Sequence, residues 1–159
     1  MIALVTGGAS SGKSAFAETL AISLPGPHIY LATMRHGDAE TEARIERHRL
    51  QRAGKGFTTV EADSSVCTLP EEGTVLLEDL GNLVANGWDL DLDRLFACGN
   101  VVVVGNEVGC DGASYDAFTC DYIRQIGALA CSIAERADVV VEVVAGIPHA
   151  VKGELPWVS

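Results

Sequence analysis

Residues 2–14 read IALVTGGASSGKS, an apolar run that passes directly into a glycine-rich loop. The run from Ile2 to Thr6 has the length and composition of a buried strand. The loop satisfies the phosphate-binding pattern G-x-x-x-x-G-K-S/T in full, and it consists of Gly7, Gly8, Ala9, Ser10, Ser11, Gly12, Lys13 and Ser14. We therefore expect a strand, a loop and a helix that together bind the phosphates of a nucleoside triphosphate.

Each part of this loop has a chemical role. Glycine permits backbone angles that turn successive N–H groups toward phosphate oxygens, and the following helix adds its positive N-terminal end. We expect Lys13 to reach the β- and γ-phosphates and the Ser14 hydroxyl to ligate Mg²⁺. Lys13 is therefore a candidate catalytic residue.

The remaining sequence predicts an α/β fold. Strands are predicted at residues 28–33, 57–60, 74–79, 101–104 and 139–144, and helices at residues 14–24, 38–51 and 115–136. Because parallel strands need helical crossovers between them, this order predicts a single domain over residues 1–159 with a mostly parallel sheet and helices on both faces. The run 139–144 is the last strand that the pattern indicates, and Phe118 is expected on the apolar side of the last helix.

The composition argues against several classes of function. The 159 residues carry a formal net charge of −11, which is unfavourable for binding along nucleic acid or an anionic membrane. No apolar run is long enough to span a membrane. The five cysteines show no paired spacing of the zinc or redox type, and no signal peptide is recognised, so we expect reduced thiols in a cytoplasmic protein.

Basic residues are nevertheless concentrated in one stretch. Six of the eleven lie between residues 35 and 55, and they are Arg35, Arg44, Arg47, Arg49, Arg52 and Lys55. A local basic cluster on an acidic protein favours a site for a small anion over a track for a charged polymer.

Polar residues follow two of the predicted strands. Glu78 and Asp79 close one apolar run, and Asn106 and Glu107 follow another. Ligands of α/β proteins bind outside the carboxyl ends of parallel strands. We therefore expect Asp79 to ligate Mg²⁺ together with Ser14, and Glu78 to contact substrate, with plain solvation of the strand ends as the alternative.

His48 lies in the polar helical segment, with Arg44 one turn before it and Arg52 one turn after it. Nearby cations favour the neutral form of an imidazole, whose free nitrogen is able to attack phosphorus and form a covalent N–P intermediate. The alternative is that His48 is a surface histidine on a solvated helix. Without further information, these residues favour that alternative.

Several sequence motifs, taken in their order along the chain, indicate a resemblance to a known family. Along the chain stand LVTGGASSGKS, IYLAT, EARIERHR, TVEA, VLLED, LGNLVAN, VVGNEVG and ADVVVEVVAGIP. With these pieces, which cover most of its length, the chain resembles the bifunctional adenosylcobinamide kinase and adenosylcobinamide-phosphate guanylyltransferase family of cobalamin biosynthesis. The phosphate loop alone is shared by many enzymes, whereas ARI-x-x-H and NEVG in this order are specific.

The resemblance implies a RecA-like P-loop fold, often assembled as a trimer, and two activities. The first is phosphorylation of a hydroxyl of adenosylcobinamide with GTP or ATP as donor, and the second is transfer of GMP from GTP to the new phosphate. Mg²⁺ would neutralise the triphosphate in both reactions. Two alternatives stay open: a P-loop kinase of another small metabolite without nucleotidyl transfer, and a non-catalytic nucleotide-binding protein.

The resemblance also implies roles for particular residues. The guanylylated histidine of the family falls on His48. Beyond the phosphate loop, the family's nucleotide-binding positions fall on Thr33, Met34, Arg35, Arg49, Leu50, Gln51, Arg52, Glu61 and Glu78. The chain has no NKxD motif to select guanine. We therefore expect Glu78 or Glu61 to do so, because a carboxylate accepts hydrogen bonds from guanine N1–H and the exocyclic amine.

The chain departs from the family pattern after NEVG. Family members continue with GIVP and an arginine-rich stretch, whereas this chain reads CDGASYDAFTCDYIRQIGALAC, in which only Gly127 clearly persists. Ala130 and Cys131 stand where Asn and Gln are expected. The nucleotide half is intact and the part expected to meet the corrinoid or a neighbouring subunit is altered. Either one activity is weakened or the acceptor differs.

Replacing Lys13 by Ala tests the phosphate loop directly. Loss of the ammonium group removes a charge-assisted contact to the β- and γ-phosphates, so nucleotide turnover should fall by orders of magnitude. The fold should persist, because the lysine belongs to a loop that faces solvent. Turnover of GTP and circular dichroism measure the two effects, and normal turnover in the variant would contradict the assignment.

Overall fold

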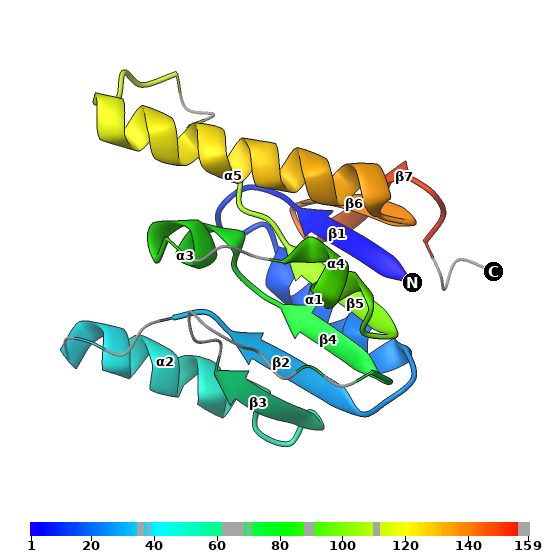
Figure 1. Cartoon of the computed structure of the whole chain (residues 1–159). Coiled ribbons are helices and arrows are strands. Elements are labelled where there is room, and N and C mark those ends of the chain that lie inside the picture. Colours follow the sequence, from blue (N-terminus) through cyan, green and yellow to red (C-terminus); the bar gives the residue numbers. More distant parts are fainter. Residues whose placement is uncertain are drawn as a thin grey trace.

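The computed structural model describes residues 1–34, 37, 39–61, 69, 71–87, 91–109 and 112–155, without the side chains of Arg44, His48 and Gln51. Within these ranges, seven strands form one sheet in the order β3-β2-β4-β5-β1-β6-β7 (Figure 1). The strands are β1 (Ile2–Thr6), β2 (His28–Ala32), β3 (Phe57–Glu61), β4 (Thr74–Leu77), β5 (Asn100–Val104), β6 (Val139–Val144) and β7 (Ile147–Lys152). The helices are α1 (Lys13–Ser23), α2 (Ala39–Arg52), α3 (Leu80–Ala85), α4 (Leu92–Phe96) and α5 (Ala117–Arg136).

The predicted parallel sheet is confirmed. Strand β1 lies between β5 and β6, β4 lies between β2 and β5, and β3 pairs with β2, all in parallel. Strand β7 alone runs antiparallel, in a hairpin with β6. The carboxyl ends of six strands therefore meet at one edge of the sheet, where the loop after β1 also lies.

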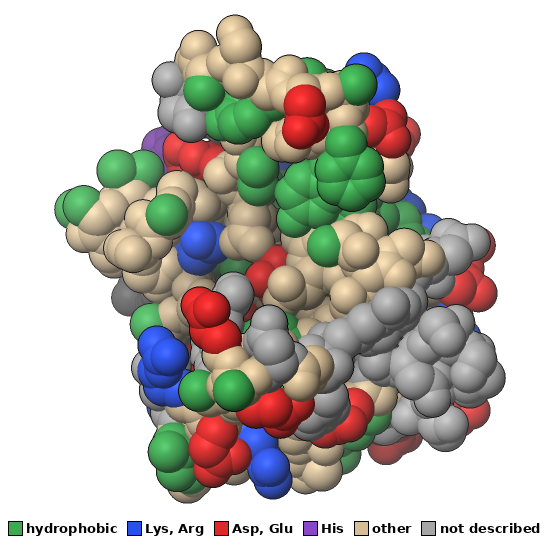
Figure 2. All heavy atoms as spheres, turned by 90° about the vertical axis from the view of Figure 1, so that its left-hand side faces the viewer, with side chains coloured by type: hydrophobic (Ala, Val, Ile, Leu, Met, Phe, Trp, Pro, Cys, Tyr) green, Lys and Arg blue, Asp and Glu red, His purple; other side chains and the backbone are tan. Residues whose placement is uncertain are grey.

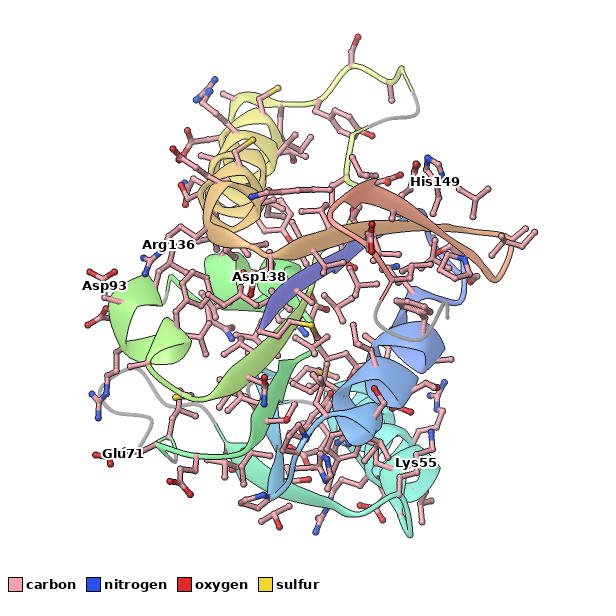
Figure 3. All side chains as sticks on the ribbon, turned by 90° about the vertical axis from the view of Figure 1, so that its right-hand side faces the viewer. Lys55, Glu71, Asp93, Arg136, Asp138 and His149 are labelled. Carbon is pink, nitrogen blue, oxygen red and sulfur yellow. The ribbon has the colours of Figure 1, made fainter. Side chains whose placement is uncertain are left out.

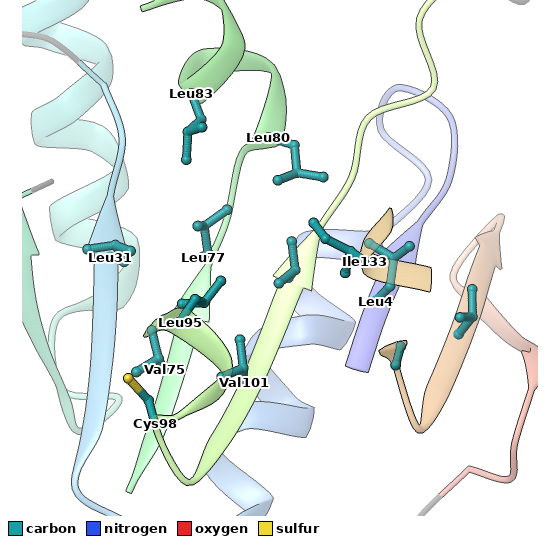
Figure 4. Close-up of a cluster of buried hydrophobic side chains, with 13 residues drawn as sticks. Leu4, Leu31, Val75, Leu77, Leu80, Leu83, Leu95, Cys98, Val101 and Ile133 are labelled. Atoms are coloured by element: carbon teal, nitrogen blue, oxygen red, sulfur yellow. The ribbon is translucent and has the colours of Figure 1, made fainter. Parts of the chain in front are cut away.

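Helices cover both faces of the sheet, as the alternation of elements predicted. On one face, Leu77 and Val101 pack with Leu95 of α4 and Ile133 of α5 in a buried cluster (Figure 4). On the other face, Leu20 of α1 packs in a second cluster with residues of β1, β2, β4, β5 and β6. Strands buried on both faces explain the continuous valine-rich runs that marked β5 and β6 in the sequence.

Several boundaries and elements differ from the sequence-based prediction. Strand β4 ends at Leu77 rather than Asp79, because Asp79 caps α3 and accepts a hydrogen bond from the backbone N–H of Asn82 at 3.0 Å. The short helices α3 and α4 were not predicted, since neither spans enough turns to show a hydrophobic period. Strand β7 was also missed, because Gly146 and Pro148 were interpreted as closing the last strand rather than as part of a hairpin.

The prediction of which residues form the apolar side of α5 is wrong at one position. Ile126 and Ile133 are buried as expected, but Phe118 is 84% exposed. Figure 1 gives the reason, since the N-terminal turns of α5 extend past the ends of the strands. At its other end, Arg136 pairs with Asp93 of α4 at 2.6 Å and lies over the ring of Phe96 (Figure 3). Within the described residues, no helix has the length and apolarity needed to cross a bilayer.

The packing of α1 predicts how two substitutions on the same helix should differ. Leu20 is fully buried, so Leu20→Ala should lower the free energy of unfolding by about 2–5 kcal/mol through lost burial and a residual cavity. Ile22 is 38% exposed, so Ile22→Ala should cost clearly less. Urea denaturation of both variants checks the difference, and equal losses would contradict the packing of α1.

Candidate nucleotide-binding site

A pocket of about 530 Å³ opens at the carboxyl edge of the sheet. Figure 2 looks onto this side of the molecule, where acidic and basic side chains lie close together near the centre of the face. The lining residues come from the phosphate loop, from α2 and from the ends of β2, β3, β4 and β5. They are Gly7, Ala9, Lys13, Ser14, Tyr30, Ala32, Thr33, Met34, Ile45, Arg49, Arg52, Thr59, Glu61, Glu78, Asp79, Asn82, Asn106 and Glu107.

The phosphate loop curls around the start of α1. Gly12 adopts a left-handed conformation with φ of +93° and precedes the first residue of the helix. The ammonium group of Lys13 donates to the carbonyl of Gly8 at 3.0 Å, so the lysine lies folded over its own loop. The first N–H groups of α1 have no carbonyl acceptor in a preceding helical turn. They therefore form an anion-binding site.

The hairpin between β6 and β7 supports this loop. The N–H of Gly146 donates to the carbonyl of Ser11 at 2.8 Å. A Cβ built on Gly12 would lie 3.2 Å from Cα of Gly146, so the two backbones are in close contact. No sequence pattern predicted this contact, because Gly146 was interpreted only as the end of a strand.

Glu78 lies at the centre of a buried charged cluster. The Tyr30 hydroxyl donates to Oε2 of Glu78, and Nη1 of Arg52 lies 3.5 Å from the same oxygen. The pKa of Glu78 is raised to about 7, chiefly because burial disfavours the charged form. The carboxylates of Glu18 and Asp79 raise the pKa further, whereas a hydrogen bond with Ser14 and the charge of Lys13 lower it.

Asp79 organises the polar groups that follow β4 and β5. Its Oδ1 accepts from the backbone N–H of Asn82 at 3.0 Å and from Nδ2 of Asn106 at 2.7 Å. Asn106 and Glu107, which follow β5, line the pocket together with Glu78 and Asp79.

The C-terminal end of α2 is fastened to the body of the protein. Arg52 is only 6% exposed, whereas Leu50 is 66% exposed and does not line the pocket. Burial lowers the pKa of Arg52, with Glu18 raising it and Arg49 lowering it. Just beyond the helix, the ammonium group of Lys55 pairs with the carboxylate of Glu18 on α1.

The structure brings most of the predicted nucleotide-binding residues to one pocket. From the phosphate loop, Gly7, Ala9, Lys13 and Ser14 line the pocket, whereas Gly8, Ser10, Ser11 and Gly12 do not. Beyond the loop, the predicted residues that line it are Thr33, Met34, Arg49, Arg52, Glu61 and Glu78. Arg35 and the side chains of His48 and Gln51 lie outside the description, although the backbone of His48 belongs to α2 between two pocket-lining residues, Ile45 and Arg49. Tyr30 and Thr59 were missed, because a strand side chain that faces a site has the same periodicity as one that faces the core.

Comparison with known proteins identifies the family. The family described as cobinamide kinase / cobinamide phosphate guanyltransferase matches residues 3–151. The chain belongs to this family. It is 34% identical to the bifunctional adenosylcobalamin biosynthesis protein CobP of Pseudomonas aeruginosa, over 95% of this chain and 97% of that protein. It is 35% identical to the bifunctional adenosylcobalamin biosynthesis protein CobU of Escherichia coli, over 96% of this chain and all of that protein.

The family match includes the whole pocket. Every lining residue, from Gly7 to Glu107, falls within residues 3–151. The predicted P-loop fold and the assignment to a kinase and nucleotidyltransferase family are therefore confirmed. The match also extends over all of β7 except Lys152, and the hairpin of β6 and β7 supports the phosphate loop.

The pocket fits a magnesium ion in its chemistry. Ser14 and Asp79 both line it and present hydroxyl and carboxylate oxygens, the ligands that Mg²⁺ prefers. A hydrogen bond links Ser14 to Glu78, the neighbour of Asp79, so the two predicted ligands lie in one part of the pocket. Mg²⁺ bound through one or two protein groups and the phosphates of a nucleotide is the usual arrangement.

Substitutions at two neighbouring glycines of the loop should affect nucleotide binding to different extents. A Cβ at Gly7 would lie 2.5 Å from the carbonyl oxygen of Val143 at a φ of +150°, so Gly7→Ala must displace the loop. Its affinity for GTP should fall by about tenfold or more. Gly8 has open space around an added Cβ, so Gly8→Ala should retain clearly more affinity. Calorimetric titration with GTP measures both, and equal effects would contradict the loop conformation.

Proposed function

We propose that this chain phosphorylates adenosylcobinamide and transfers GMP from GTP to the resulting phosphate through a guanylyl intermediate on His48. The observation that carries the proposal is that one pocket joins the phosphate loop to α2. Lys13 and Ser14 line it from one side, and Ile45, Arg49 and Arg52 of α2 line it from another. A triphosphate bound by the loop would therefore extend toward the helix that contains His48.

The proposed guanylyl transfer consists of two displacements at the same phosphorus. A ring nitrogen of His48 attacks the α-phosphorus of GTP, an N–P bond forms, and the bond to the bridging oxygen breaks to release pyrophosphate. An oxygen of the phosphorylated acceptor then attacks this phosphorus and the N–P bond breaks, which regenerates the histidine. Arg49 and Lys13 would stabilise the negative charge that develops on the phosphates. Mg²⁺, when bound through Ser14 and Asp79, would neutralise charge on the triphosphate.

We assign recognition of the guanine base to Glu61 in preference to Glu78. The carboxylate of Glu78 is already shared by Tyr30 and Arg52, close to the phosphate loop. Glu61 ends β3, which lies two strands away from β4 at the edge of the sheet, and it lines the same pocket. This separation matches a nucleotide that has its phosphates on the loop and its base near β3.

The remaining assignments rest on the family and on charge. The acceptor is adenosylcobinamide or its phosphate, GTP and ATP are donors, and the protein acts in the cytoplasm as a homo-oligomer, with a trimer as the expected assembly. Val144, Ile147 and Val151 form exposed apolar surface on the β6–β7 hairpin, which supports association. The net charge of −11 disfavours a nucleic-acid partner.

A covalent label on His48 tests the mechanism. With α-labelled GTP and Mg²⁺, the denatured wild-type chain should retain label that acid releases and base does not, because an N–P bond is labile in acid. Label from γ-labelled GTP should not remain in this adduct. His48→Asn should abolish the adduct and leave GTP affinity largely intact, because the phosphate loop supplies most contacts.

His149→Asn is the matched control. His149 is exposed on β7 and does not line the pocket, so its replacement should leave the labelling unchanged. Absence of α-label in the wild type, or retention of label by His48→Asn, would contradict the guanylyl-histidine mechanism. A chain without α-label that still releases ADP or GDP with an acceptor would be a plain kinase, and one that releases neither would be a nucleotide-binding protein.

A further inference from the structure

Tyr30 is a buried residue whose hydroxyl has a specific partner. It belongs to β2, is 3% exposed, and lies in the apolar cluster on the α1 face of the sheet. Phe57 of β3 packs edge-on against its ring, with the ring centroids 6.4 Å apart. A phenylalanine would fill this position equally well as an apolar group. The hydroxyl therefore needs a separate explanation.

The side chain of Tyr30 makes two contacts that lie outside this apolar packing. Its hydroxyl donates to Oε2 of Glu78, just after β4. The guanidinium carbon of Arg52, the last residue of α2, lies 3.4 Å from the centroid of its ring. Because Nη1 of Arg52 is also 3.5 Å from Oε2 of Glu78, the three side chains form a closed set that joins β2, α2 and β4. We call this set the Tyr30 cluster.

Arg52 depends on this cluster because it is buried. A guanidinium that is 6% exposed has lost most of its contact with water, and its Nε has no hydrogen-bond partner within the described residues. The ring face of Tyr30 and the carboxylate of Glu78 supply the electrostatic stabilisation that water no longer provides. A change in the position of either group would therefore displace Arg52.

The cluster lies between the two parts of the pocket that the proposed reaction must bring together. Glu78 is hydrogen-bonded with Ser14 of the phosphate loop. Arg52 lies four residues after His48 in α2, which is about one helical turn. A fixed distance between Glu78 and Arg52 therefore limits where the turn that contains His48 lies relative to the loop.

We propose that Tyr30 is a positioning residue that holds Arg52 and Glu78 together and so orients α2 toward the phosphate loop for guanylyl transfer. The proposal rests on the function proposed above. Tyr30 itself touches no reacting atom. It acts through its ring on Arg52 and through its hydroxyl on Glu78.

Tyr30→Phe is the test, because it keeps the ring under Arg52 and removes the hydroxyl. The rate constant for guanylylation at saturating α-labelled GTP should fall by about tenfold or more, since one hydrogen bond to a charged group is lost. The dissociation constant for GTP should stay within about twofold, because the phosphate loop is unchanged. Tyr122→Phe is the matched control: it also loses a tyrosine hydroxyl, which donates to the carbonyl of Gly81 at 3.1 Å, and should label at the normal rate.

A double-mutant cycle separates positioning from a general structural effect. If Tyr30 acts through Glu78, then Tyr30→Phe should cost little further rate in a Glu78→Gln background. An unchanged labelling rate in Tyr30→Phe, a parallel loss of GTP affinity and thermal stability, or fully additive losses in the cycle would each overturn the proposal. Absence of label in the wild type overturns the proposed function and this proposal together, whereas normal wild-type labelling with normal Tyr30→Phe labelling overturns this proposal alone.

Discussion

Strand β1 can satisfy its backbone only with a strand on each side, and the rest of the molecule depends on which strands these are. Both neighbours, β5 and β6, are parallel to it and buried. Parallel pairing requires the chain to return through helices, which cover the two faces. It also places the loop after β1 at the same edge as the ends of β2, β3, β4 and β5. The pocket is a consequence of this pairing, because the pairing brings together lining residues that are distant in sequence.

A second constraint is the energetic cost of burying charge beside that pocket. Arg52 and Glu78 are 6% and 14% exposed at their side chains, and neither would be stable there without the other. Burial shifts both pKa values toward the neutral forms, upward for Glu78 and downward for Arg52. Such shifts are common where a protein arranges groups for chemistry rather than for stability. The cluster therefore marks the functional edge of the sheet independently of the sequence motif.

The sequence predicted most of the fold because the decisive signals were local. The glycine pattern from Gly7 to Ser14 and the valine runs of β5 and β6 are readable from a few neighbouring residues. Strand β7 was not readable, because its place in the sheet depends on pairing with β6 and its Pro148 is tolerated only in such an edge strand. Helices α3 and α4 are too short to show a period. Phe118 was wrongly predicted to be buried, because helical spacing does not indicate where the sheet beneath α5 ends.

The residues of the candidate site could be predicted where they belong to a local sequence motif. They could not be predicted where their role depends on contacts between residues that are distant in sequence. The phosphate loop is marked by its glycine pattern. The carboxylates Glu78 and Asp79 are marked by their place at the end of an apolar run. Tyr30 has no such sequence signal, because its role arises from two contacts that are distant in sequence. The register of β2 and β4 brings it to Glu78, and the end of α2 brings Arg52 onto its ring. The same reasoning applies to Gly146, which reaches the phosphate loop only because β6 lies beside β1.

The altered sequence after Gly109 has a structural consequence that follows from this arrangement. Among the described residues, those that line the pocket include none from α5, where most of the altered stretch lies. Helix α5 contributes Ile126 and Ile133 to the core and holds Gly81 through Tyr122, while Phe118, Cys120 and Cys131 are exposed. Changes on its exposed side leave the nucleotide pocket untouched. Substitutions on this side of α5 therefore do not alter the phosphate loop, the Tyr30 cluster or the end of α2, which line the pocket from other elements.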